Sequence, residues 1–231
     1  MRLSKLTRFA LPPAVAVCAY LWCVRPWYLR WGASDGESSV ALPGDDLVEE
    51  PHLSATRAIT IRASAVEVWP WIAQMGQGRG GLYSYDVLEN LVGCEIHSAD
   101  RVVPEWQDVR VGDEFRLHPE VGLEVAAVDH GRSLVIRGTV PMGDAAPPYD
   151  FTWAFVLHPA PAGRTRLLVR ERYRYNRWWA PLLVEPVETV SFVMSRRMLR
   201  GIRDRAERTP ASERTGDVRP LALARAEGGR R

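Results

Sequence analysis

Cysteine and histidine are too few and too scattered to form a disulfide framework or a metal site. Cys18 and Cys23 lie in an apolar N-terminal run and Cys94 stands alone, so no C-x-x-C pair exists. The five histidines show no metal-ligand spacing, and the motifs H-E-x-x-H and G-x-S-x-G are missing. We therefore expect no metal ion, and no motif identifies a catalytic residue.

An excess of charge of one sign is also lacking. The 30 Lys and Arg residues nearly balance the 28 Asp and Glu residues, which leaves a net charge of +2. Nucleic-acid-binding proteins usually concentrate basic residues on one face, so we expect no nucleic-acid partner. With 46% hydrophobic and 25% charged residues, the 231-residue chain can form one globular domain with appendages.

An uncharged apolar run, "FALPPAVAVCAYLWCV", occupies residues 9–24. Three basic residues precede the run, and Arg25, Trp27 and Tyr28 follow it. At ~1.5 Å per residue the run is slightly short for a hydrocarbon core of ~30 Å, but its basic and aromatic flanks are typical of membrane segments. The sequence predicts a single-pass membrane anchor within residues 1–31, with the side of the membrane left open. A cleaved signal peptide and a buried N-terminal helix are the alternatives.

The glycines in "MGQGRGG" match the dinucleotide-binding pattern G-x-G-x-x-G through Gly76, Gly78 and Gly81. That function requires a strand before the glycines and a βαβ unit around them. Ser64 and Glu67 instead have capping-box spacing and start a short helix that leads into the loop. We expect a helix-to-helix turn that binds neither NAD nor FAD, and we expect no other cofactor.

The remaining pattern predicts one α+β domain over residues 56–208. A first strand has Ile59 and Ile61 on one side and Arg57 on the other, and consecutive antiparallel strands fill residues 113–175. A long helix is expected to start at Pro186, with Val187, Val190, Met194, Met198 and Ile202 on its apolar stripe. Residues 32–55 are predicted to be a linker, and residues 209–231 a disordered tail.

This order of elements resembles the SRPBCC or START-like superfamily, often labelled polyketide cyclase/dehydrase-like. The resemblance spans about residues 56–208 and is carried by the stretches "VWPWIAQMG", "RGGLYSYDVLENLVG", "PEWQDVRVGDEF" and "MSRRMLRGIRDRAE". It implies a helix-grip fold, in which a curved sheet wraps the C-terminal helix around an apolar cavity. Members of the superfamily bind lipids, sterols, polyketides or other hydrophobic molecules, and some are enzymes.

Alternation along "RTRLLVRERYRY" predicts which side chains face such a cavity. Leu167, Val169, Tyr173 and Tyr175 share one face with Glu171, while the even-numbered arginines form a solvated face. A buried carboxylate needs a partner, for which we consider Arg79 and Arg101. The hairpin around "APAG" should place Trp153 near Glu171. The predicted ligand-binding residues are Tyr83, Trp153, Phe155, Val169, Glu171, Tyr173, Val190, Met194 and Met198.

These features favour a membrane-anchored protein that binds a hydrophobic small molecule or lipid between the sheet and the C-terminal helix. One alternative is a metal-free cyclase or dehydratase with Glu171 as the candidate acid or base, because such chemistry needs only well-placed proton donors and acceptors. A second alternative is a protein-interaction module whose cavity has no function. The sequence identifies no protein partner.

Overall fold

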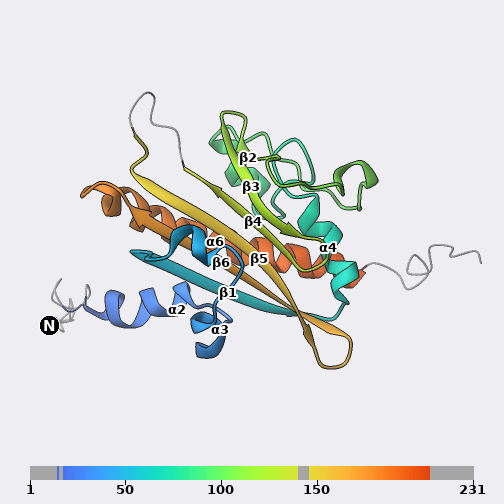
Figure 1. The fold of residues 1–231 in the computed structure, drawn as a ribbon, viewed down its shortest axis with the longest axis horizontal. Coiled ribbons are helices and arrows are strands. Elements are labelled where there is room, and N and C mark those ends of the chain that lie inside the picture. Colours follow the sequence, from blue (N-terminus) through green and yellow to red (C-terminus); the bar gives the residue numbers. More distant parts are fainter. Residues whose placement is uncertain (1–14, 16–17, 140–145, 209–231) are drawn as a thin grey trace, which may run out of the picture.

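A six-stranded antiparallel sheet and one long helix dominate the fold (Figure 1). The computed structural model describes residue 15 and residues 18–139 and 146–208. Neighbouring strands pair in the order β1-β6-β5-β4-β3-β2, and the long helix α6 runs along one side of the sheet. This α+β arrangement fits the expected helix-grip fold. The strands are β1 (Leu53–Ile61), β2 (Glu114–His118), β3 (Val121–Asp129), β4 (Ser133–Gly138), β5 (Tyr149–Ala160) and β6 (Arg164–Tyr175).

The predicted hairpin register is confirmed. β5 and β6 pair with Trp153 opposite Glu171 and with Phe155 opposite Val169. Phe155 and Val169 are buried in the main hydrophobic core, which lies on the same side of the sheet as α6. The alternation of apolar and charged residues therefore sets which face of this hairpin is turned inward.

Helix α6 (Ala180–Arg208) starts earlier than predicted, because Pro186 lies inside it. Ala180 and Val184 are 0% and 3% exposed, and their burial favours the extra turns despite the missing backbone donor of the proline. The buried stripe of α6 also differs from the predicted one. It contains Val184, Glu188, Phe192, Ser195, Leu199 and Ile202, whereas Val187 and Val190 are exposed.

The glycine loop joins helix α4 (Ala65–Ala73) to helix α5 (Asp86–Leu91), so the predicted helix-to-helix turn is confirmed. The capping box at the start of α4 is also present. Gly76 and Gly81 pair in an isolated antiparallel bridge, and both have positive φ. These glycines therefore serve a tight turn that other residues would strain.

Residues 25–48 pack against the sheet instead of standing apart from it. Helix α2 (Arg25–Leu29) buries Tyr28, which is 2% exposed. The carbonyl of Trp31 accepts a hydrogen bond of 3.1 Å from the backbone N–H of Ala58, and it thereby covers part of the free edge of β1. The folded part therefore begins before residue 56, and the predicted division at residue 31 does not coincide with a structural boundary.

Of the apolar run at residues 9–24 in the predicted anchor, residues 9–14, 16 and 17 lie outside the described residues. Its described end contains a π-helical turn, η1 (Tyr20–Val24), which leads into α2. Across the described residues, no helix is both long and apolar enough to cross a membrane, so a single-pass anchor is not supported. The predicted tail, residues 209–231, also lies outside the described residues.

Arginines on the outer face of β6 bind the segment that was predicted to be a linker. Arg170 donates to three backbone carbonyls of residues 37, 38 and 40 and pairs with Asp45 at 2.6 Å. Arg166 pairs with Glu37 at 2.7 Å, and Arg172 pairs with Asp45 at 3.0 Å. The prediction of a solvated arginine surface is therefore wrong for these three residues, because helix α3 (Asp35–Ser39) and the 3₁₀ turn η2 (Asp45–Val48) supply their acceptors.

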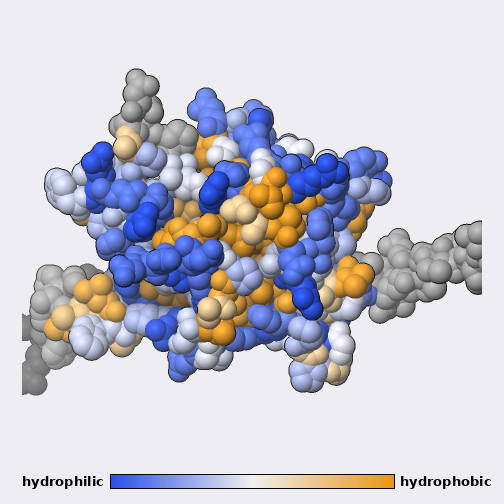
Figure 2. Space-filling view, in the orientation of Figure 1, coloured by the Kyte–Doolittle hydropathy of each residue, from blue (hydrophilic) through white to orange (hydrophobic). Residues whose placement is uncertain are grey.

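The same segment covers apolar residues on the face of the sheet that points away from α6. Leu42 packs there with Val135, Ala154 and Leu168, all of which are buried. Figure 2 shows that some hydrophobic residues still reach the surface in the middle of the molecule, where hydrophilic residues surround them. Ion pairs and apolar contacts thus hold the segment to the sheet together.

Substitution of Arg170 tests this interpretation. Arg170→Leu should lower the free energy of unfolding by about 3–5 kcal/mol, because Asp45 and three carbonyls lose a buried donor. Arg174→Leu is the matched control on the same strand and face. Arg174 is 50% exposed and pairs with Asp150, so its loss should cost less than about 1 kcal/mol. Equal losses in chemical denaturation of the two variants would contradict a structural role for the segment.

Candidate functional site

A cavity of about 230 Å³ lies between the sheet and the first half of α6. Its wall combines apolar and aromatic side chains with one carboxyl group and several hydroxyl groups. Strands β2, β3, β5 and β6 supply most of this wall, and α6 closes it. The lining residues are Leu117, Val121, Leu123, Thr139, Tyr149, Phe151, Trp153, Glu171, Tyr173, Val187 and Ser191.

Glu171 is the acid in the cavity wall, and it is 2% exposed. Its Oε1 accepts hydrogen bonds from Arg57 Nη1 at 2.9 Å and from Ser195 Oγ at 3.0 Å. Its Oε2 accepts from Ser191 Oγ at 3.0 Å and from the Tyr173 hydroxyl at 3.4 Å. These four donors offset the loss of hydration that burial of a carboxylate entails.

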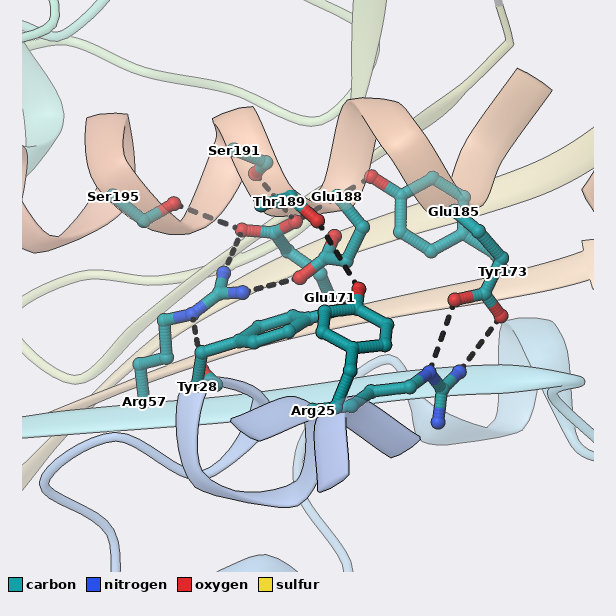
Figure 3. Close-up of polar contacts among 11 residues, drawn as sticks. Arg25, Tyr28, Arg57, Glu171, Tyr173, Glu185, Glu188, Thr189, Ser191 and Ser195 are labelled. Atoms are coloured by element: carbon teal, nitrogen blue, oxygen red, sulfur yellow. Dashed lines mark hydrogen bonds and ion pairs between the residues drawn. The ribbon is translucent and has the colours of Figure 1, made fainter. Parts of the chain in front are cut away.

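Arg57 connects Glu171 to a second buried carboxyl group, that of Glu188 on α6 (Figure 3). Its Nη2 donates to Glu188 Oε1, and its Nε donates to the backbone oxygen of Tyr28 at 3.2 Å. The guanidinium also lies 5.5 Å from the centroid of the Phe192 ring. One fully buried side chain thus joins β1, β6, α6 and the end of α2.

The cluster of Arg57, Glu171 and Glu188 holds two carboxyl groups but one guanidinium. Glu188 is 0% exposed, and its Oε2 meets no hydrogen-bond donor among the described residues. Burial, together with the nearby charge of Glu171, raises the pKa of Glu188 to about 8, although Arg57 opposes the shift. Glu188 therefore holds a proton near neutral pH, which relieves the excess negative charge.

Helix α2 covers the outer side of this cluster. Arg25 pairs with Glu185 of α6 at 2.7 Å, and the hydroxyl groups of Tyr20 and Tyr28 lie 3.0 Å apart. Burial raises the pKa of Tyr28 to about 12, so this hydroxyl stays protonated. The N-terminal segment therefore separates the buried charges from solvent.

The structure brings three of the predicted ligand-binding residues to the cavity, namely Trp153, Glu171 and Tyr173. The predicted strand residues Phe155 and Val169 lie in the main core and do not line the cavity. Their side chains share the inward face, but the cavity occupies only the end of the hairpin near Tyr149 and Tyr173.

The predicted residues of α6 do not line the cavity either. Met198 is buried in the main core, Val190 is 61% exposed, and Met194 is half-buried with its carbonyl bonded to Ser84. Because Glu188 is turned inward toward Arg57, α6 is rotated so that Val187 and Ser191 line the cavity. Tyr83 is buried in the loop before α5, beside a different groove.

The partners of Glu171 differ from those considered from the sequence. Arg79 donates to the carbonyls of Ala73 and Trp106, and Arg101 is exposed. The true partner is Arg57, which we assigned to the opposite face of its strand. Its odd number, shared with Ile59 and Ile61, was the signal that could have placed it on the inner face.

Glu188 and Ser195 were also missed. Both lie at helical spacing from Val184 and Phe192, so they belong to the buried stripe of α6. A glutamate at such a position is usually assigned to the polar edge of a helix, because its burial is costly without a partner. The partner, Arg57, lies 131 residues away in the chain, and no local pattern reveals it.

Comparisons with known proteins do not assign the chain to a family. No family model matches the sequence, and no curated protein matches it.

Several solved structures are distantly similar. Protein MLL2253 from Mesorhizobium loti is 15% identical, with 68% of this chain and 99% of that chain covered and a TM-score of 0.43. Hypothetical protein jhp0584 from Helicobacter pylori is 12% identical, with 75% and 99% covered and a TM-score of 0.46. CalU16 from Micromonospora echinospora is 16% identical, with 67% and 83% covered and a TM-score of 0.34. At these scores the likenesses carry no argument about function.

The raised pKa of Glu188 predicts how stability depends on pH. Between its unfolded pKa of about 4.3 and its folded pKa of about 8, the folded protein binds one more proton, so the free energy of unfolding should fall as pH rises, by up to about 1.4 kcal/mol per pH unit. Glu188→Gln keeps an oxygen for Arg57 and removes the titration, so its stability curve should be flatter. Glu185→Gln, at a partly exposed site, is the control. Unfolding curves of equal slope for wild type and Glu188→Gln would contradict the protonated cluster.

Proposed function

We propose that the protein binds a small hydrophobic molecule in the cavity between the sheet and α6. The observation that supports this is the make-up of the cavity, in which apolar and aromatic walls meet one group of buried polar side chains. Small-molecule sites commonly have this composition, because apolar walls supply affinity and a few polar groups fix orientation. The volume of about 230 Å³ lies below the usual ~300–1,000 Å³, which favours a single ring system or a short chain.

The hydrogen bonds around Glu171 also favour a particular polar group on the ligand. The hydroxyl groups of Ser191 and Tyr173 both donate to Glu171, so they offer lone pairs to the cavity. A ligand hydroxyl or amide N–H can donate to these oxygens. A ligand carboxylate would instead face acceptors and the charge of Glu171, so a neutral ligand is favoured.

A second candidate is an acid–base enzyme of the cyclase or dehydratase type. It is favoured by the protonated Glu188, which shares Arg57 with the carboxyl group in the cavity wall. Burial raises the pKa of Tyr173 well above its ordinary value, so this hydroxyl stays protonated and can donate a hydrogen bond beside Glu171, although the higher pKa makes it a weaker acid. Loss of water from a bound hydroxy ketone needs a base at the carbon and a proton donor at the leaving oxygen. Glu171 would take the proton from the carbon, Tyr173 would give its proton to the departing water, and the proton on Glu171 would then return to the Tyr173 oxygen.

Filling the cavity tests the binding proposal. Val121→Trp should abolish uptake of free indole, a neutral single ring system with one N–H donor, measured by isothermal titration calorimetry, because the new side chain would occupy the space without removing a polar contact. Val66→Trp is the control, since Val66 is 79% exposed on α4. Thermal unfolding of the same samples verifies that both variants are folded. Unchanged uptake by a folded Val121→Trp variant would exclude this cavity as the binding site.

Native mass spectrometry of the purified protein separates the binder from the enzyme. We compare the wild type with Tyr173→Phe, which removes the proposed proton donor and keeps the ring. A binder should retain the same small molecule in both forms, with weaker retention in the variant. A dehydratase should carry a lighter product in the wild type and a molecule heavier by one water in the variant. Tyr149→Phe, also in the cavity wall, controls for the loss of a hydroxyl.

A further inference from the structure

A groove of about 560 Å³ runs between the start of α5 and the C-terminal half of α6, and none of its lining residues lines the cavity described above. Four arginines of α6 line it, together with one acid, Asp86. The carboxylate of Asp86 already accepts two hydrogen bonds from Ser98, at 2.6 and 2.7 Å. The arginines are Arg196, Arg197, Arg200 and Arg205.

Aromatic rings position these arginines. Arg196 and Arg200 lie 5.4 and 5.7 Å from the centroid of the Trp31 ring, and Arg197 lies 5.9 Å from that of Tyr85. Within the described part of the chain, none of these three forms an ion pair with a carboxylate, and the buried Nε of Arg196 has no acceptor. Three guanidinium groups therefore line one groove, and among the described residues none of them has a carboxylate partner.

The floor of the groove is fixed by a close approach of two backbones. Gly201 of α6 packs against the loop before α5, where a Cβ atom would overlap the backbone oxygen of Tyr83. Tyr83 itself has a φ of 56° and is 1% exposed. This contact holds α5 beside the arginines of α6.

Exposed apolar residues border the arginines on both helices. On α5, Val87 and Leu91 are 75% and 77% exposed, and on α6, Val190 and Val193 are 61% and 46% exposed. Isolated exposed apolar residues are common on protein surfaces, but here they flank an uncompensated cationic groove. Basic residues between exposed apolar side chains are typical of surfaces that lie on anionic bilayers.

We propose that this face, formed by α5 and the outer side of α6, docks on an anionic phospholipid surface. The guanidinium groups of Arg196, Arg197 and Arg200 would bind lipid phosphates through paired N–H donors. The apolar side chains of Val87 and Leu91 would enter the boundary between headgroups and acyl chains. This interaction is peripheral, and it is independent of the proposed ligand in the cavity.

Vesicle sedimentation with the full-length chain tests this proposal. Vesicles of phosphatidylcholine alone are compared with an equimolar mixture of phosphatidylcholine and phosphatidylglycerol, at low and at high salt. The double substitution Arg197→Glu with Arg200→Glu should lower binding to the anionic vesicles at least about tenfold. The control is Arg110→Glu with Arg132→Glu, which makes the same change in net charge at two exposed sites away from the groove. It should bind like the wild type.

Several outcomes would overturn the proposal. If the two double variants bind the anionic vesicles equally, the arginines of the groove contribute no more to binding than arginines elsewhere on the surface. Equal binding of the wild type to both kinds of vesicle shows that anionic lipid is not what it recognises. Binding of free glycerol phosphate through Arg197 and Arg200, without binding to vesicles, identifies a soluble anion as the occupant. Val121→Trp, which fills the cavity, should leave vesicle binding unchanged, so failure of the cavity proposal can be told apart from failure of this one.

Discussion

The buried guanidinium of Arg57 is the interaction on which the arrangement of the other elements depends. It binds Glu171 on β6, Glu188 on α6 and the backbone of Tyr28 at the end of α2. Such charges are expensive to bury, at several kcal/mol per ion, so they persist only where geometry and hydrogen bonds compensate. The cluster therefore restricts the rotation of α6, because Glu188 must face the sheet, and this places Ser191 at the cavity and Val190 in solvent.

The side chains on the two faces of strand β6 have different structural roles. On one face, the odd-numbered residues Glu171 and Tyr173 form the polar part of the cavity wall. On the opposite face, the arginines of β6 bind the N-terminal segment. The two systems also meet through Tyr28, whose backbone oxygen receives Arg57. A change in how the N-terminal segment packs would therefore alter the environment of the carboxyl group in the cavity, although the segment lies outside it.

Local alternation and spacing predicted the strands of the hairpin, its register, the capping box of α4 and the turn that contains Gly76, because each of these depends on residues close in the chain. The same information failed where distant residues decide. Glu188 is buried because Arg57 meets it, and residues 32–48 are ordered because Arg170 supplies donors to their carbonyls. Neither Glu188 nor residues 32–48 is apolar enough for its burial to be predicted from the local sequence. The candidate site could therefore be predicted only in part.

The pairing of β1 with β6 affects how the chain folds during its synthesis. β1 ends at Ile61, yet its one neighbour within the described sheet begins at Arg164, so more than half of the domain must be synthesised before β1 can pair. Contacts between such distant segments form slowly, because a long loop must close first. On the ribosome, β1 therefore lacks its partner strand until β6 has emerged, and during that interval its unpaired edge is open to pairing with other chains.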